Sequence, residues 1–223
     1  MPSNRKIVFA NGEYYHVFNR GVEKRPIFMT KYEYFRAIDA ISFYRYGGIP
    51  IRYSKYLNLN KDDKADFLSN LGQSQLQIDI IAYCFMNNHF HFLLKQLKDN
   101  GIVKFMAKFT NSYTKYFNTK YERVGPLFQG VFKAVHVEDD EQLLHLSRYI
   151  HLNPVTSYII KSEDLSSYKW SSYQGYLKIV ENKMVNISEV GSFFKKPMDY
   201  EKFVLDQADY QKQTKFIEHL LID

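Results

Sequence analysis

The sequence predicts an α+β fold in which helices pack on one or both faces of a mostly antiparallel sheet. Aromatic and β-branched runs alternate with segments of helical periodicity. Only Asn87 and Asn88 separate two of the apolar runs, and Asx residues tolerate the tight turn of a hairpin. The 223 residues, 45% of them hydrophobic, suffice for a core that needs neither disulfides nor a structural metal.

The first half of the chain predicts a strand, a helix and a hairpin. Residues 13–18 are aromatic and β-branched and stop at a turn signal, so we expect a strand there. Apolar positions in 31–45 recur at helical spacing, and a Gly-Gly-Ile-Pro run ends that helix. Residues 46–76 are polar and mixed, which predicts a surface insert with room for a short helix. Residues 77–85 and 88–95 form the expected hairpin.

The second half predicts two helices around a short strand, followed by an accessory segment. A long helical pattern covers 99–119, and glycines and a proline surround an aromatic strand near 127–136. Acidic residues at 138–141 begin the next helix, where the helix dipole favours negative charge. We expect this helix to end at Asn153, because proline follows. We place the main domain at 1–160 and a C-terminal segment at 161–223, with helical patterns at 187–195 and 199–221.

Charge and aromatic content favour a nucleic-acid partner. The net charge is +6 and aromatic residues make up 17% of the chain; basic side chains follow phosphates and rings stack on bases. A merely solvated basic surface is the alternative. The one cysteine, Cys84, lies in an apolar run and predicts a buried thiol. No apolar stretch is long enough for a signal peptide or a membrane span, so we expect a cytoplasmic protein with no membrane partner.

The second strand of the hairpin carries a His-Phe-His pattern. Side chains alternate along a strand, so His89 and His91 face one side while Phe90 and Phe92 face the other. Two imidazoles whose roots lie about 7 Å apart on one strand can converge on a metal ion, because neutral imidazole is a common ligand. The alternative is a pair of polar residues on a solvated sheet face.

A tyrosine and an asparagine share one face of the helix that begins near residue 140. Tyr149 and Asn153 are four residues apart, which places them on the same side. A tyrosine beside a metal can act as a nucleophile, and the carboxamide oxygen of Asn153 can be a third ligand. His145, one turn earlier, is a rival ligand. A half-buried core tyrosine and an Asn153 that only caps the helix are the alternatives; His151 has no expected role.

Four motifs, in a fixed order, carry a family resemblance. They occupy residues 15–21, 89–91, 125–130 and 149–155 and read YHVFNRG, HFH, GPLFQG and YIHLNPV. In this order they resemble the single-tyrosine HUH transposases and, within them, the REP-associated tyrosine transposases. The resemblance covers roughly residues 8–175, including the YKWSSY tail at 168–173.

The resemblance implies a ferredoxin-like sheet with the histidine strand at its centre, and DNA cleavage and joining in transposition. His89, His91 and Asn153 would hold Mg²⁺ or Mn²⁺. Tyr149 would attack the phosphate and form a 5′-phosphotyrosine. Relatives carry glutamine or histidine where this chain has the shorter Asn153. The substrate implied is single-stranded DNA with an adjacent hairpin, and this branch favours a monomer over a homodimer.

Five basic residues are candidate DNA contacts. Lys104, Lys108 and Lys115 recur at spacings of four and seven, which predicts one basic stripe on a helix or, alternatively, a solvated face. Arg20, after the first strand, and Arg123, before the glycine-flanked strand, are further phosphate candidates.

Two other function classes compete with the transposase. A domesticated relative would bind hairpin DNA on the same fold without forming a covalent adduct. A metal-dependent hydrolase would use the histidines to activate water, although the sequence lacks the carboxylate-rich cluster that such sites usually carry.

Overall fold

The fold is built on a four-stranded sheet. In the computed structural model, which describes residues 7–73 and 75–208, the strands are β1 (Tyr14–Arg20), β2 (Ile78–Phe85), β3 (His89–Gln96) and β4 (Lys133–Val137). Their order is β2-β3-β1-β4 and every pairing is antiparallel. The expected antiparallel sheet is therefore confirmed, and the histidine strand β3 is an inner strand.

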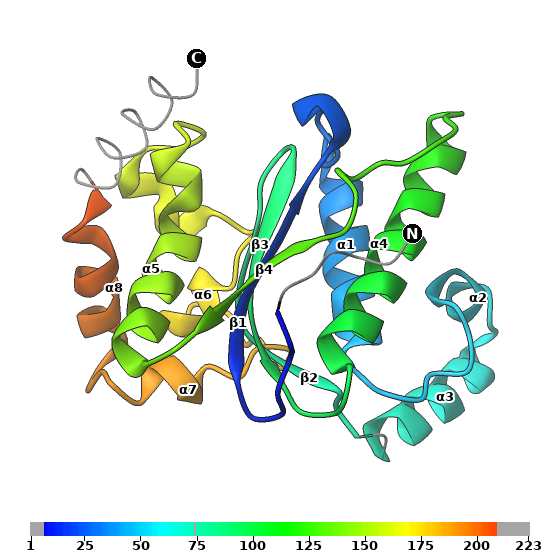
Figure 1. Cartoon of the computed structure of the whole chain (residues 1–223), viewed down its shortest axis with the longest axis horizontal. Helices are drawn as coiled ribbons and strands as arrows, with labels where there is room; N and C mark the ends of the chain where they lie inside the picture. Colours follow the sequence, from blue (N-terminus) through cyan, green and yellow to red (C-terminus); the bar gives the residue numbers. More distant parts are fainter. Residues whose placement is uncertain (1–6, 74, 209–223) are drawn as a thin grey trace.

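Helices cover both faces of this sheet (Figure 1). Helices α1 (Lys31–Tyr44) and α4 (Gly101–Lys120) pack against each other on one face, and α5 (Asp140–Thr156) lies on the other. Together with the strand order, the succession β1-α1-β2-β3-α4-β4 is the ferredoxin-like arrangement that the resemblance implies. Helix α5 contacts β2 and β3, so it covers only that half of its face.

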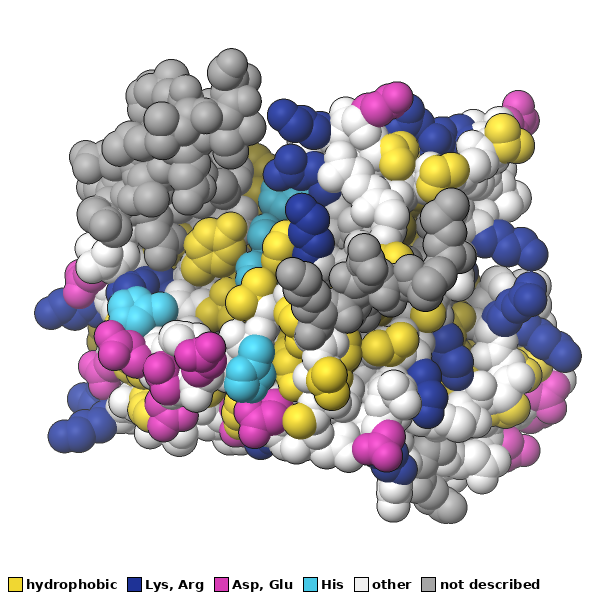
Figure 2. Space-filling model, viewed as in Figure 1, with side chains coloured by type: hydrophobic (Ala, Val, Ile, Leu, Met, Phe, Trp, Pro, Cys, Tyr) yellow, Lys and Arg dark blue, Asp and Glu magenta, His cyan; other side chains and the backbone are white. Residues whose placement is uncertain are grey.

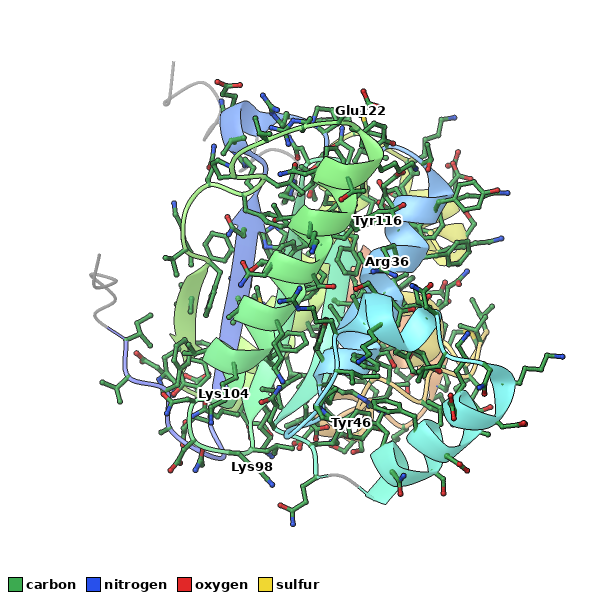
Figure 3. All side chains as sticks on the ribbon, turned by 90° about the vertical axis from the view of Figure 1, so that its right-hand side faces the viewer. Arg36, Tyr46, Lys98, Lys104, Tyr116 and Glu122 are labelled. Carbon is green, nitrogen blue, oxygen red and sulfur yellow. The ribbon has the colours of Figure 1, made fainter. Side chains whose placement is uncertain are left out.

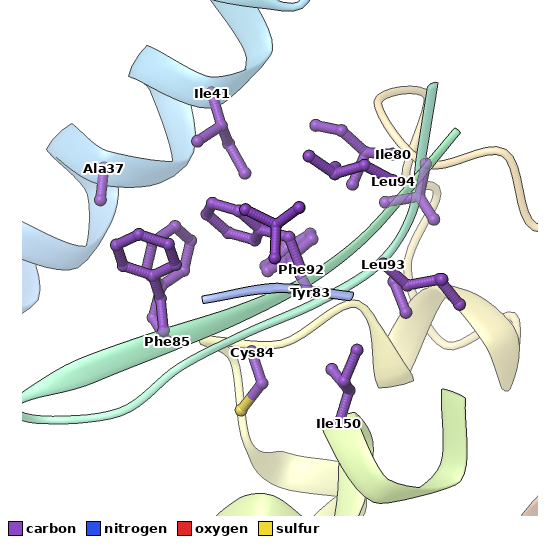
Figure 4. Close-up of a cluster of buried hydrophobic side chains, with 14 of the residues drawn as sticks. Ala37, Ile41, Ile80, Tyr83, Cys84, Phe85, Phe92, Leu93, Leu94 and Ile150 are labelled. Carbon is purple, nitrogen blue, oxygen red and sulfur yellow. The ribbon is translucent and has the colours of Figure 1, made fainter. Parts of the chain in front are cut away.

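The core lies on both sides of β2 and β3. Ala37 and Ile41 of α1 face one side of the sheet, while Ile150 of α5 faces Cys84 on the other (Figure 4). A strand covered on both faces is apolar at nearly every position, which explains the unbroken burial of 80–85. Cys84 is fully buried, as the sequence predicts.

The insert at 46–76 contains more structure than the sequence predicts. It holds α2 (Tyr53–Leu57) and α3 (Lys61–Gln73). The ring of Phe43 in α1 lies 5.1, 5.3 and 5.6 Å from those of Tyr53, Tyr56 and Phe67. This aromatic cluster fastens both insert helices to the main fold.

Two predicted boundaries are wrong. Helix α5 continues through Pro154 to Thr156 instead of ending at Asn153. A proline in the last turn removes only one backbone hydrogen bond, and the amide of Ser157, just past the end of the helix, still donates to the carbonyl of Asn153 at 2.9 Å. The strand expected near 127–136 is also shorter than predicted, because β4 begins only at Lys133. In the segment before it, Gly125 and Gly130 have positive φ angles of 89° and 60°, and an extended strand does not accommodate such angles.

The segment after residue 160 packs around α5, with α8 on the outer side of that helix (Figure 1), and it pairs with β2 through the isolated bridges Cys84–Ser171 and Ile80–Val185. It contains the 3-10 turn η2 (Ser162–Ser167), α6 (Tyr173–Tyr176), α7 (Ser188–Gly191) and α8 (Pro197–Leu205); another 3-10 turn, η1 (Val22–Lys24), follows β1. Of the helix expected over 199–221, the first part is α8, which ends at Leu205, and residues 209–221 lie outside the described part of the chain. None of the described helices has the length and apolarity needed to cross a membrane.

A buried imidazole joins this segment to α5. His151 Nδ1 lies 2.6 Å from the hydroxyl of Tyr200 in α8, and its Nε2 lies 2.7 Å from Ser172 Oγ. Both ring nitrogens are therefore hydrogen-bonded in a fully buried position. His151, to which the sequence assigned no role, is a structural residue.

Candidate active site

The two strand histidines face α5, with their phenylalanine neighbours on the opposite side. The rings of His89 and His91 are 5.1 Å apart. Phe90 and Phe92 pack against Phe109 of α4, with ring centres 5.4 and 5.8 Å away. The phenylalanines anchor β3 in the core and leave the imidazoles on the α5 side of the sheet, where His89 is half-buried and His91 is buried.

Tyr149 lies at these histidines. Its ring centre is 5.5 Å from that of His91 and 6.0 Å from that of His16 on β1, edge to face in both cases. Tyr149 is half-buried, because α5 leaves this part of the sheet partly open. The structure thus brings together three segments that are far apart in the sequence: β1, β3 and α5.

His16 belongs to this site, although the sequence analysis assigned it no role. Its Nε2 lies 2.9 Å from Nδ1 of His91, and the two rings stack at 5.1 Å. Burial lowers the pKa of His16 to about 4, so the ring is neutral near pH 7. The alternation of residues 15–21 places His16 and Arg20 on one face, but only the pairing of β1 with β3 shows that this face is the histidine face.

His89 is oriented by the residue before it. Its Nδ1 lies 2.6 Å from Oδ1 of Asn88, so it donates a hydrogen bond to that amide oxygen. His91 uses its own Nδ1 toward His16. Both strand histidines therefore use Nδ1 to contact a neighbouring side chain, which fixes the orientation of each ring.

The rival candidates on α5 have different surroundings. Asn153 is fully buried one turn after Tyr149, and it is not the helix cap, because the helix ends at Thr156. His145 is exposed; its Nδ1 lies 2.5 Å from Arg148 Nη2, its Nε2 lies 3.7 Å from Glu141, and its ring lies 6.2 Å from that of Phe203 in α8. These contacts hold His145 toward the C-terminal segment.

One of the five basic candidates lies beside the histidines. Arg20 is paired directly with His89 across β1 and β3, and paired residues share a face of the sheet. By the same pairing, Lys133 of β4 lies opposite Phe18, which is itself opposite His91. Figure 2 shows Lys and Arg side chains beside a column of histidines in a hollow of the surface. The sequence analysis did not single out Lys133.

The other basic candidates lie elsewhere. Lys104, Lys108 and Lys115 are on α4, which covers the sheet face away from the histidines. Arg123 follows α4, where its Nη1 lies 3.0 Å from Oδ1 of Asn118. The structure therefore does not bring these four residues together with Tyr149.

The donor set suits a divalent ion with mixed nitrogen and oxygen ligands. His89 and His91 offer imidazole nitrogens, and Asn153, the carboxamide that the sequence analysis names as a candidate, follows Tyr149 by one turn on α5. Imidazole with oxygen donors is compatible with Mn²⁺ and, less closely, with Mg²⁺, which prefers oxygen. Within the described residues, no group of three or more His, Cys, Asp or Glu side chains is arranged to hold a metal. An ion at this place would complete its ligands with a carboxamide, water or substrate oxygens.

Comparisons with known proteins agree with the resemblance. A model of the family described as "Transposase IS200 like" matches residues 54–153. A solved structure described as a REP-associated tyrosine transposase bound to a REP hairpin matches with a TM-score of 0.52 and 14% identity, covering 83% of this chain and 89% of that one. No curated protein matches. The similarity to transposases of this kind, read from the motifs, is confirmed, and the shared fold is that of the hairpin-bound protein.

Proposed function

We propose that this chain, which resembles the IS200-like transposases, cleaves and rejoins single-stranded DNA through a covalent tyrosine intermediate in a metal-dependent reaction. The observation that carries the proposal is the convergence of Tyr149 on the histidine strand, with its ring 5.5 Å from that of His91. The match to a transposase family model supports a transposition-related role in DNA processing.

Tyr149 supplies the nucleophile. Its phenolic oxygen attacks the phosphorus of the scissile phosphodiester, and the bond from phosphorus to the 3′ oxygen breaks. The proton lost from the phenol is balanced by the proton gained at the departing 3′-hydroxyl. The downstream strand then remains on Tyr149 as a 5′-phosphotyrosine. Because the phosphodiester energy is retained, a 3′-hydroxyl can attack in reverse and rejoin DNA without a nucleotide cofactor.

His89 and His91 would hold the divalent ion. Each uses Nδ1 in a contact with a neighbour, Asn88 for one and His16 for the other, and this is the arrangement in which Nε2 is the metal-binding atom. We propose Asn153 as the third ligand, by its place one turn after Tyr149. When bound, Mg²⁺ or Mn²⁺ neutralises charge that develops on the scissile phosphate. His16 then keeps His91 in one ring orientation.

The open half of the sheet would receive the single strand. Helix α5 covers β2 and β3, which leaves the β1 and β4 residues beside the histidines accessible; Val135, paired with His16, is 53% exposed. Arg20 beside His89, and Lys133 beside Phe18, would contact phosphates on either side of the scissile bond. The half-buried ring of Phe18 offers a surface on which a base can stack. A hairpin next to the cleavage site is proposed by analogy with the hairpin-bound structural neighbour.

A denaturing gel tests the proposal. The protein is incubated with Mn²⁺ and a pool of 3′-labelled oligonucleotides in which a hairpin is flanked by randomised single strands. We expect label on the protein, because the 5′ phosphate of the downstream fragment is on Tyr149, and no such band for Tyr149→Phe, which keeps the ring. Hairpin binding without any labelled protein would favour the domesticated binder, and cleavage without labelled protein would favour a hydrolase.

A further inference from the structure

A second basic site lies on the opposite side of the sheet from Tyr149. A cavity of about 800 Å³ opens between α1, α4 and the start of the insert, which is the size of ligand-binding pockets in general. Its side chains come from α1, from residues 49–54 and from one face of α4. Figure 3 shows Arg36 and Tyr116 side by side between the two helices, with Lys104 at another part of α4.

The rim of this cavity is positively charged. The basic side chains that line it are Arg36, Arg52, Lys108, Lys115 and Lys120, and no Asp or Glu is among its described lining residues. Nearby, Glu33 forms an ion pair with Lys120, and Asp39 attracts Arg36 electrostatically. Those two carboxylates offset only part of the five positive charges, so the cavity is suited to an anion.

One of these cations is held at the wall of the cavity by aromatic rings. The guanidinium of Arg36 lies 4.4 Å from the ring centre of Tyr53 and 5.2 Å from that of Tyr116. Its Nε is buried and has no hydrogen-bond partner within the described residues. Because this nitrogen is inaccessible, an anion in the cavity would be attracted by the charge of the whole guanidinium, which the two rings hold in position.

The lining of the cavity is also partly apolar. Ile49, Pro50 and Ile51 of the insert line it together with Tyr44. Apolar side chains beside cations match a nucleotide unit, which has an uncharged planar base and a negatively charged phosphate. A duplex keeps its bases stacked inside and offers only phosphates, whereas a single strand can place a base in the cavity.

We infer that this cavity is a second binding site for single-stranded DNA, which holds one nucleotide while the rim contacts neighbouring phosphates. The inference rests on the proposed function only in the choice of DNA as the ligand. It gives the 46–76 insert a role, since residues 49–54 form one wall. Lys108 links the two walls, with its Nζ 3.5 Å from the carbonyl of Ile49.

Fluorescence anisotropy with a labelled 15-mer of thymidylate tests the inference, because this strand has no hairpin. At 0.1 M salt, each lost phosphate contact on a single strand lowers affinity about fivefold, so we expect roughly 25-fold weaker binding for Arg52→Gln/Lys115→Gln. The control, Lys161→Gln/Lys169→Gln, removes the same charge from exposed residues outside the cavity lining and should change affinity less than about twofold.

A steric variant separates the cavity from a generally basic surface. Ala107→Leu adds bulk to the cavity lining on α4 without a change in charge and without a ring on which a base could stack, and we expect it to weaken binding about tenfold, a difference of about 1.4 kcal/mol. Thermal melts confirm that each variant is folded. Unchanged binding by Ala107→Leu, or equal losses in the two charge variants, overturns the inference.

Competitors identify the ligand chemistry. Displacement of the 15-mer by thymidine monophosphate would show that one nucleotide suffices, and displacement only by longer strands would show that several phosphates are required; both outcomes support a nucleotide site. Equal displacement by poly-glutamate or by a blunt hairpin overturns it. These are binding measurements, so a wild-type protein that forms no covalent adduct would refute the proposed catalysis and leave this result standing.

Discussion

Removal of the hydrogen bond between His16 and His91 tests the proposed metal site. His16→Phe keeps a ring of similar size between Phe18 and His91, whose centres lie 4.7 and 5.1 Å from that of His16. It deletes the 2.9 Å contact with Nδ1 of His91. The orientation of His91 is then no longer fixed by a partner on β1, although its position on β3 is unchanged.

The expected magnitude follows from that contact. A partner of this kind typically contributes about 10- to 100-fold to metal affinity. We expect Mn²⁺ to bind about tenfold more weakly to His16→Phe, with a matching increase in the Mn²⁺ concentration needed for half-maximal adduct. The metal-free protein should also lose about 1–3 kcal/mol of unfolding free energy, because a buried nitrogen of His91 loses its partner.

Calorimetric titration with Mn²⁺ gives the affinity, and melts in chelator give the stability. His136→Phe is the control: His136 is on β4, faces away from the site and pairs with Glu13 at 2.8 Å. His16→Gln, which can still hydrogen-bond, should recover part of the affinity. The reasoning is refuted if His16→Phe binds Mn²⁺ as tightly as the wild type while melting at a lower temperature, because His16 would then be only a packing residue.

Three other predictions concern single residues. Burial raises the pKa of Glu33, but hydrogen bonds from Lys120, Thr30 and Tyr121 outweigh it and hold the pKa at about 2. This stabilisation is therefore complete above about pH 4.5 and is lost as the pH falls toward 2; urea unfolding should show that Glu33→Gln is about 2 kcal/mol less stable at pH 7, with the difference vanishing in acid. Asn153→Ala should weaken Mn²⁺ binding and Asn153→Gln should restore part of it, whereas unchanged affinity in Asn153→Ala, measured by the same titration, removes Asn153 from the ligands. Tyr200→Phe, which loses the 2.6 Å contact with His151, should lower the free energy of unfolding by about 1–2 kcal/mol. A melting temperature equal to that of the wild type would show that this hydrogen bond does not stabilise the packing of α8 on α5.

The sequence predicts the local parts of the site and not its assembly. The alternation of residues 89–92 has a period of two, so the orientation of His89 and His91 follows from the sequence alone. The role of His16 depends on the register between β1 and β3, whose partners are some 75 residues apart, and no local pattern encodes that register. The same holds for Lys133, whose position beside Phe18 follows only from strand pairing.

Two errors in the predicted fold have different physical causes, one local and one tertiary. The helix was expected to end at Asn153 because proline usually stops a helix. Pro154 instead lies in the last turn of α5, where the loss of one backbone N–H costs little. The insert was expected to be surface structure because its composition is polar. Its few aromatic residues, Tyr53, Tyr56 and Phe67, become significant only where they meet Phe43 of α1.

The buried contacts of His151 limit which segments can be combined in a chimeric protein of this fold. His151 is two residues from Tyr149 on α5, and its partners, Ser172 and Tyr200, both come from the segment after residue 160. A chimera that joins α5 to the C-terminal segment of a distant relative would leave this buried imidazole with mismatched partners. Recombination near residue 160 therefore preserves the position of Tyr149 only when α5 and the segment come from the same protein.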